Sequence, residues 1–251
     1  MSDTRDVARL PVEILAHILA DVDFDDLKTC SLVSRAFLLA TRPYIFERAT
    51  IDLHPYSTSS GSAQNHPSTK FLQFLACDEE NYAGSFISTL CFVDKLSSSP
   101  LPVEHLESHW SEVAEQLAKL LPKLTRLHHL VIKSSFLSDW TLVHNGMRQV
   151  LFQFMQVHTV HHVELHHIGL SRGELLALTW IRKVTLVGVY EAYKQTSNTT
   201  IHPAQHMVSL LRNLSITLKS PEGARYMFQL ANAAKKSLSS LRWLTSSYIG
   251  M

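Results

Sequence analysis

The fold is decided by a short pattern that reads Val160-His161-His162-Val163-Glu164-Leu165, with apolar side chains at its first, fourth and sixth positions. Its second half alternates apolar and polar residues, which is the period of a half-buried β-strand. The spacing recurs along the chain as Ile87-x-x-Leu90-x-Phe92, Leu127-x-x-Leu130-x-Ile132, Ile181-x-x-Val184-x-Leu186, Leu211-x-x-Leu214-x-Ile216 and Leu238-x-x-Leu241-x-Trp243. Each of these stretches is predicted to form a strand.

Helix-like stretches separate the predicted strands. They cover residues 110–121, 144–155, 171–178, 202–210 and 222–236. Strand and helix thus alternate at intervals of 21 to 40 residues, which indicates an α/β solenoid with a parallel sheet. A non-repetitive α/β fold is the alternative, because any parallel βαβ protein alternates in this way. Residues 49–53 and the stretch around 71–77 are expected to form a leading half-unit.

This C-terminal region resembles leucine-rich repeats in a degenerate, irregular form. The repeat length varies, and the usual Asn or Cys after the strand is missing from most units. The resemblance implies that the concave face of the sheet binds a partner. The chain stops at Met251 soon after a predicted strand and without an evident polar closing repeat. We therefore expect a version truncated at its C-terminus.

Alignment of the units places three columns of residues on the sheet face away from the core. The first column contains Thr89, His129, His162, Lys183, Asn213 and Ser240. The second contains Cys91, Val131, Glu164, Thr185, Ser215 and Arg242, and the third Val93, Lys133, His166, Val187, Thr217 and Leu244. We expect a substrate protein to contact His129, His162, Glu164, His166, Lys183, Thr185, Asn213 and Arg242. For any single residue, a plain solvated position is the alternative.

The first fifty residues show helical periodicity. One helix face carries Ile14, Leu15, Ile18, Leu19 and Val22, with Pro11 in the first turn. Asp25 or Asp26 is expected to cap a second helix that carries Leu27, Leu32 and Val33. Ser34 is expected to cap a third, through Phe37, Leu38 and Leu39, which Pro43 should interrupt. Three such short helices bury too little surface to stand alone, so this module must lean on a neighbour.

These residues resemble the F-box. The match starts with the L-P-x-E-I-L-x-x-I-L pattern at Leu10-Pro11-Val12-Glu13-Ile14-Leu15-Ala16-His17-Ile18-Leu19. It continues through Asp26-Leu27, Ser31-Leu32-Val33-Ser34-Arg35-Ala36-Phe37 and Arg42-Pro43-Tyr44-Ile45-Phe46. The last two segments resemble the S-L-V-S-R-x-F and R-P-x-x-F sequences that are frequent in fungal versions of the motif. The acidic turn Phe24-Asp25-Asp26 is a departure. The alternative is an amphipathic helical hairpin that has no F-box function.

The resemblance implies an N-terminal three-helix F-box at residues 1–48, followed by the repeat-like region at residues 49–251. It implies docking to the Skp-type adaptor of SCF ubiquitin ligases, and through it to a cullin, by helices entering an apolar groove. The candidate docking residues are Leu10, Pro11, Ile14, Leu15, Ile18, Val33, Ser34 and Phe37. Some of them must instead hold the three helices together, and the sequence leaves that division open.

Composition excludes several other classes. Lys plus Arg number 23 and Asp plus Glu 22, without a basic stripe, so nucleic acid is not an expected partner. Residues 1–9 are polar, unlike a signal peptide, and no apolar run approaches the roughly 20 residues of a membrane span. Cys30, Cys77 and Cys91 contain no C-x-x-C spacing and read as buried thiols. We expect a cytoplasmic or nuclear protein without a membrane partner.

Histidine is frequent, with 15 residues. His162, Glu164 and His166 share one strand face, with His129 potentially adjacent, and such a set could hold zinc. Histidines on a strand surface are more often solvated, so the sequence predicts no metal and no cofactor. It contains no G-x-S-x-G, H-E-x-x-H, P-loop or G-x-G-x-x-G motif, and no enzyme is expected. The predicted function is a ligase substrate adaptor. A non-ligase binding scaffold is the alternative, and a metal-dependent enzyme the outsider.

Overall fold

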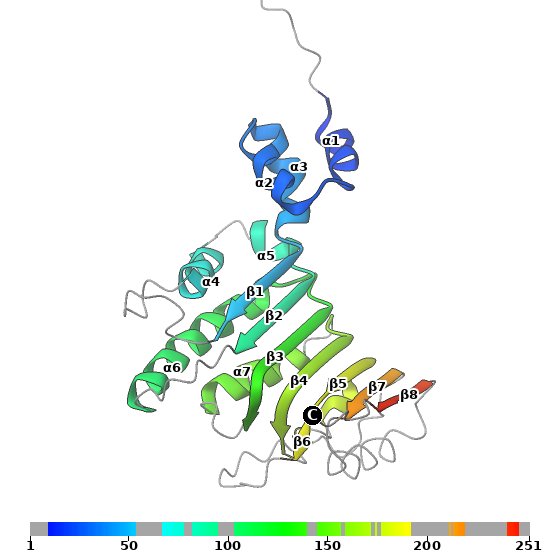
Figure 1. The fold of residues 1–251 in the computed structure, drawn as a ribbon. Helices are drawn as coiled ribbons and strands as arrows, with labels where there is room; N and C mark the ends of the chain where they lie inside the picture. The colour runs from blue at the N-terminus through cyan, green and yellow to red at the C-terminus, as the bar shows by residue number, and fades with distance from the viewer. Residues whose placement is uncertain are drawn as a thin grey trace, which may run out of the picture.

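The computed structural model describes residues 10–53, 67–77, 82–94, 103–139, 145–156, 159–171, 174, 177–191, 211, 213–218 and 240–245. Three N-terminal helices precede one sheet with helices along one side (Figure 1). The predicted helices at 202–210 and 222–236 lie outside these ranges. Of the helices within them, none combines the length and apolar character needed to cross a membrane.

The N-terminal helices are α1 (Val12–Leu19), α2 (Phe24–Ser31) and α3 (Arg35–Ile45). They close over a small apolar cluster of their own, whose buried members are Leu15, Leu19, Leu27 and Ala40. The hydroxyl of Tyr44 on α3 donates a hydrogen bond of 2.8 Å to the carbonyl of Ala16 on α1. The three predicted helices are therefore confirmed, and so is the small size of their shared core.

The helix ends agree only in part with the sequence patterns. Ser34 caps α3 as predicted, its Oγ accepting a hydrogen bond of 3.4 Å from the Phe37 amide. The cap of α2 is Asp23, so the prediction of Asp25 or Asp26 is wrong. Both carboxylates lie in the first turn instead, where the partial positive charge of the helix N-terminus favours them.

Pro43 does not interrupt α3, which continues to Ile45. The proline lies in the last turn, where its missing N–H costs a single hydrogen bond. Tyr44 and Ile45, just beyond it, pack against the small apolar cluster. This packing keeps the final turn helical in spite of the proline.

One parallel sheet forms the rest of the described fold. Its strands are β1 (Arg48–Asp52), β2 (Thr89–Asp94), β3 (His129–Asp139), β4 (His162–Leu170), β5 (Lys183–Val187), β6 (Tyr190–Glu191), β7 (Asn213–Leu218) and β8 (Ser240–Thr245). The order is β1-β2-β3-β4-β5-β7-β8, with the short β6 paired to β4. The fourth and sixth positions of each repeated apolar pattern lie on a separate strand, so the predicted strands and the α/β class with a parallel sheet are confirmed.

The helices of this region are α4 (Pro67–Cys77), α5 (Tyr82–Phe86), α6 (Val103–Leu120) and α7 (Asn145–Gln156), with 3-10 turns at Leu121–Lys123 and Leu178–Trp180. Figure 1 shows α4, α6 and α7 on one side of the sheet. The predicted helices at 110–121 and 144–155 correspond to α6 and α7. The structure describes only part of the predicted helix at 171–178, and this part leads into the second 3-10 turn.

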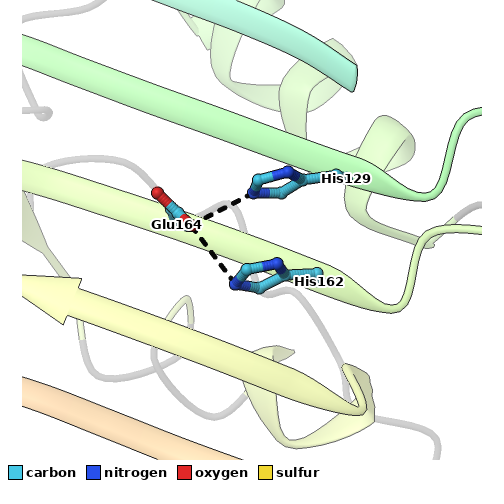
Figure 2. Close-up of side chains that lie close together, drawn as sticks. All are labelled: His129, His162 and Glu164. Atoms are coloured by element: carbon cyan, nitrogen blue, oxygen red, sulfur yellow. Dashed lines mark ion pairs between the residues drawn. The ribbon is translucent and has the colours of Figure 1, made fainter. Parts of the chain in front are cut away.

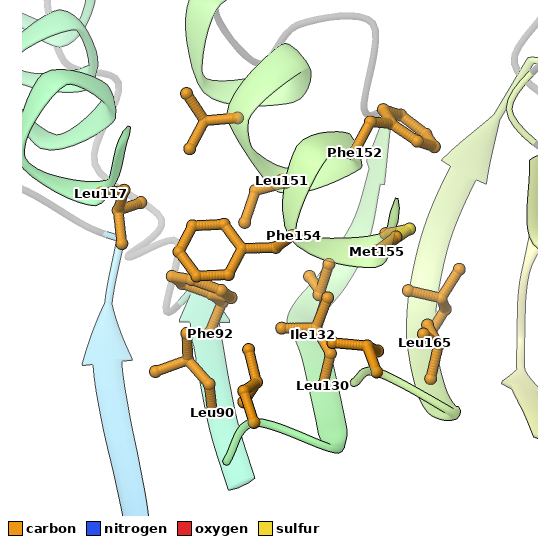
Figure 3. Packing of buried hydrophobic residues seen from close by; sticks show 14 of the residues in the cluster. Leu90, Phe92, Leu117, Leu130, Ile132, Leu151, Phe152, Phe154, Met155 and Leu165 are labelled. Atoms are coloured by element: carbon orange, nitrogen blue, oxygen red, sulfur yellow. The ribbon is translucent and has the colours of Figure 1, made fainter. Parts of the chain in front are cut away.

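The main core lies between the sheet and these helices. Figure 3 shows Phe92, Leu130 and Ile132 of neighbouring strands facing Phe154 and Met155 of α7. The rings of Phe92 and Phe154 meet edge to face, with centroids 6.1 Å apart and an interplanar angle of 75°. Both rings are fully buried, so strand β2 and helix α7 share one packing contact at the centre of the core.

A buried ion pair, which the sequence patterns did not indicate, connects α7 with the segment after β4. Arg148 Nε donates a hydrogen bond of 3.1 Å to Glu174 Oε1. The other carboxylate oxygen accepts a bond of 2.7 Å from the Ser171 amide. Both charged side chains are almost fully buried, where an ionised group is tolerated only with a partner. The pair therefore fixes the chain after β4 against α7.

Replacement of Phe154 by alanine tests the packing of the main core. We expect a loss of about 3–5 kcal/mol in the free energy of unfolding, because the change empties a fully buried aromatic site. Urea denaturation followed by circular dichroism measures it. Leu32→Ala, at a side chain that is 85% exposed, is the matched control and should stay within about 0.5 kcal/mol of the native chain. Equal losses in the two variants would contradict this assignment of the core.

Candidate functional site

Helix α1 presents a row of exposed apolar side chains. Leu10, Ile14 and Ile18 are 51%, 49% and 57% exposed and follow one another at intervals of four residues. Within α1 this spacing places Ile14 and Ile18 on one face, and Leu10 stands two residues before the helix begins. We call these three residues the α1 apolar row. Leu32 and Val33, also exposed, stand in the turn between α2 and α3. Exposed apolar patches of this kind mark interaction surfaces.

The predicted docking residues separate into two groups. Leu10, Pro11, Ile14, Ile18 and Val33 are exposed and accessible to a partner. Three others serve the helical module itself: Leu15 is buried in its cluster, Phe37 packs partly buried against that cluster, and Ser34 caps α3.

The prediction that the second helix carries Leu32 and Val33 is wrong. Helix α2 ends at Ser31, so Leu32 is its capping residue and Val33 lies in the following turn. The sequence feature that could have indicated this exposed turn is the adjacent pair Leu32-Val33 immediately before the Ser34 cap. The pair extends the candidate surface beyond α1.

The sheet presents a second candidate surface, on the face away from the main core. Successive strands pair in the predicted register, which joins Thr89, His129, His162, Lys183, Asn213 and Ser240 into one column. The same pairs join Glu164 to Thr185, Ser215 and Arg242. A third set runs from Val93 through Lys133, His166 and Val187 to Thr217. The predicted alignment of the columns is confirmed.

Exposure along the middle column differs from the prediction. Cys91 and Val131 are buried, although neither belongs to the main core cluster. Both lie on interior strands of the sheet, β2 and β3. The expected exposure of this column is therefore wrong for Val131, whereas the burial of Cys91 agrees with its interpretation as a buried thiol. Glu164, Thr185 and Ser215 further along are partly exposed.

Four residues of this face form a compact group, here called the histidine–glutamate cluster: His129, His162, Glu164 and His166. Glu164 Oε1 lies 3.3 Å from His129 Nε2 and 3.4 Å from His162 Nε2 (Figure 2). Its other oxygen, Oε2, lies 3.4 Å from His166 Nε2. The imidazole rings of His129 and His162 are stacked, with centroids 4.1 Å apart and planes 3° from parallel. The Nε2 atoms of three histidines therefore lie close to the carboxylate of Glu164.

Strand geometry creates this cluster. His129 and His162 are the first residues of β3 and β4 and pair directly in the register. Glu164 and His166 follow at intervals of two on β4 and so point to the same face. Lys183 and Thr185 occupy the equivalent positions on β5, opposite His162 and Glu164. The adjacency of His129 and His162 that the sequence indicated is thus confirmed.

Burial and neighbouring charges lower the pKa of both stacked histidines. Desolvation is the largest cause for His162, and His129 and Lys183 act in the same direction, so that its pKa falls from 6.5 to about 4. Desolvation also lowers the pKa of His129, against the opposing attraction of Glu164. Both side chains are only about one-fifth exposed, at 23% for His129 and 18% for His162. Both rings are consequently neutral at pH 7.

Glu164 keeps its negative charge in this setting. Desolvation raises its pKa, but the hydrogen bond from His166, together with the electrostatic effect of the neighbouring histidines, outweighs that effect and lowers the pKa. The cluster therefore offers one carboxylate and two neutral imidazoles. Their ligand atoms, from His129, His162 and Glu164, all lie within 4.8 Å of one another, which makes them the group capable of holding a metal within the described part of the chain.

The remaining predicted face residues surround this cluster. Lys183 and Asn213 are exposed, and Thr185 is partly buried with its Oγ1 3.3 Å from His162 Nε2. Arg242 lies on β8 opposite Ser215, and its side chain is not among those that the structure describes. The face thus continues from the cluster toward polar and basic positions on β5 and β7.

Acidification tests the burial of His162. Its folded-state pKa of about 4 lies below the ordinary value near 6.5, so the unfolded chain binds more protons between these values. Stability from this group is present above pH ~6.5 and is lost as the pH falls toward ~4. With a chelator present, lowering the pH from 7.5 to 4.5 should reduce the free energy of unfolding of the native chain by about 1–2 kcal/mol more than that of His162→Gln. This estimate already includes a reduction for partial solvation of the ring. Urea midpoints at several pH values measure the difference, and parallel curves would contradict it.

Comparison with known proteins bears on the N-terminal module. The family model of the F-box-like domain matches residues 7–51, which include α1, α2, α3 and most of β1. No curated protein matches the chain. The matched segment carries the α1 apolar row and the exposed pair Leu32-Val33. The chain therefore contains an F-box-like domain at residues 7–51.

Proposed function

We propose that this chain is the substrate-recognition adaptor of an SCF-type cullin–RING ubiquitin ligase. An F-box-like domain supports an adaptor role in general, since such domains bind Skp-type adaptors. The observation that carries the proposal is the exposure of Leu10, Ile14 and Ile18 within the matched segment. The three helices already have a small closed core to which these side chains do not belong, so they are available to contact a partner.

The α1 apolar row has the chemistry of a helix that enters an apolar groove. About half of each side chain is exposed, and burying that half contributes about 1 kcal/mol per residue. Leu32 and Val33 extend the apolar surface into the next turn. The family resemblance assigns the groove to a Skp-type adaptor, which in turn connects the chain to a cullin and a RING subunit.

We further propose that the sheet region is an irregular leucine-rich-repeat-like array that binds the target protein. Sequential parallel strands in register, with helices on one side, support this reading. The opposite face offers mixed polar groups, from the histidine–glutamate cluster to Lys183 and Asn213. In this arrangement the chain holds the target protein close to the ligase, and associated subunits perform the ubiquitin transfer.

Co-expression of the full chain with a Skp-type adaptor, followed by size-exclusion chromatography, tests docking. The native chain should co-elute with the adaptor. Ile14→Asp combined with Ile18→Asp should weaken binding at least about 100-fold, because a charge in an apolar groove loses its hydration. Phe74→Asp is the matched control: it removes an equally exposed apolar side chain, on α4 outside the matched segment. Its ring stacks on Phe46 and not on the α1 apolar row, so binding should stay intact.

Leu15→Ala separates docking from folding. This residue is buried in the cluster of the three helices, so the change should lower the stability of the module by about 2–5 kcal/mol. The Asp double variant should retain the native circular dichroism spectrum. A folded, monodisperse native chain that never co-elutes with the adaptor would overturn the ligase assignment. A binding scaffold that acts without a ligase would then be the better description.

A further inference from the structure

We propose that His129, His162 and Glu164 form a binding site for one divalent transition-metal ion, for which Zn²⁺ is the best fit, with His166 as the residue that positions Glu164. The site lies on the sheet face and does not depend on docking through the F-box-like domain. It is built from the histidine–glutamate cluster, whose members the register of β3 and β4 brings together.

The donor set determines the class of metal. Two imidazole nitrogens and one carboxylate oxygen suit zinc and its neighbours in the first transition series, whereas Mg²⁺ and Ca²⁺ prefer oxygen ligands throughout. Three protein ligands with a fourth position open are the arrangement of many zinc sites that bind a further molecule. On this face, the open position would take a water molecule or a side chain of a bound protein.

The distances between the ligand atoms agree with this chemistry. Two ligands that each lie about 2.1 Å from a tetrahedral zinc ion stand about 3.4 Å from each other. Glu164 Oε1 is 3.3 Å from His129 Nε2 and 3.4 Å from His162 Nε2. Figure 2 shows both rings directed toward the carboxylate from neighbouring strands. Because the rings are now stacked almost parallel, metal binding requires a rotation that makes their nitrogen lone pairs converge.

His129 provides a separate indication. Its Nε2 is buried and makes no hydrogen bond among the described residues. Glu164 Oε1, at 3.3 Å, is within ion-pair distance but is not aligned as a hydrogen-bond acceptor. A buried polar atom without such a partner costs free energy in any folded protein. Coordination of a metal ion through this nitrogen would remove that cost.

The surroundings contain both supporting and opposing groups. His166 Nε2, 3.4 Å from Glu164 Oε2, holds the carboxylate oxygen that is not directed at the stacked rings. Such an outer partner orients a ligand and tunes its strength. Lys183 on β5 pairs with His162, and Lys133 on β3 pairs with His166, so each brings a like charge near a bound cation. Lys183 is exposed, and its charge can turn toward solvent.

Equilibrium dialysis of the full, untagged chain against Zn²⁺, after removal of metals with a chelator, tests the site. We expect one zinc ion per chain. His129→Gln, His162→Gln and Glu164→Gln should each weaken binding by more than the ~10–100-fold typical of changes in outer partners. Lys183→Gln should bind zinc more tightly, because a repelling charge is removed. His161→Gln is the matched control, since this exposed histidine precedes His162 directly and stacks on His128 instead.

Co²⁺ serves as a spectroscopic probe of the positioning role. His166→Gln should weaken Co²⁺ binding about 10–100-fold and shift its visible absorption, while the melting temperature without metal stays unchanged. Zinc should raise the melting temperature of the native chain and of His161→Gln, but not that of Glu164→Gln. The proposal is overturned if the native chain binds no stoichiometric zinc, or if Glu164→Gln and His161→Gln bind it equally well. The tighter zinc binding expected for Lys183→Gln cannot arise from misfolding.

Discussion

The hydrogen bonds at the amino ends of the strands set the geometry on which the sheet depends. The carbonyl of Ser88 accepts bonds from the amides of His128 and His129, and the carbonyl of His128 accepts from His161 and His162. The carbonyls of His161 and Arg182 continue the series to Lys183 and Asn213. Each strand therefore begins at the level of its neighbour. Once this level is fixed, every residue along a strand has an assigned partner, and a shift by one would exchange the buried and exposed faces.

This common level explains how much of the fold could be predicted from the sequence. The apolar pattern has a fixed spacing, so alignment of the repeats by sequence is also alignment in space, as the column through His129, His162 and Lys183 shows. Helices α6 and α7 were predictable from their periodicity for a related reason: each must bury one apolar stripe on the same face. Sequence spacing is informative wherever a local period decides burial.

Features that depend on neighbours distant in the sequence were not predictable. Cys91 and Val131 are buried although they lie outside the main core cluster, and no period along β2 or β3 encodes that. The ion pair of Arg148 and Glu174 joins residues that share no local motif. At the candidate site, the sequence indicated that His129 could adjoin His162. It could not show that both rings are four-fifths buried, and the premise that they are freely solvated is therefore wrong.

Separation of the two sheet faces has an evolutionary consequence. The column of Leu90, Leu130, Val163, Val184 and Leu214 belongs to the main core, whereas the residues beside it on each strand face the other way. Mutations on the outer columns leave the core and the backbone hydrogen bonds unchanged, apart from the few positions that are themselves covered. Duplicated genes with this architecture can diverge in those columns one residue at a time. Substitutions in those columns can thus change the surface chemistry of this face, while the residues of the opposite face preserve the fold.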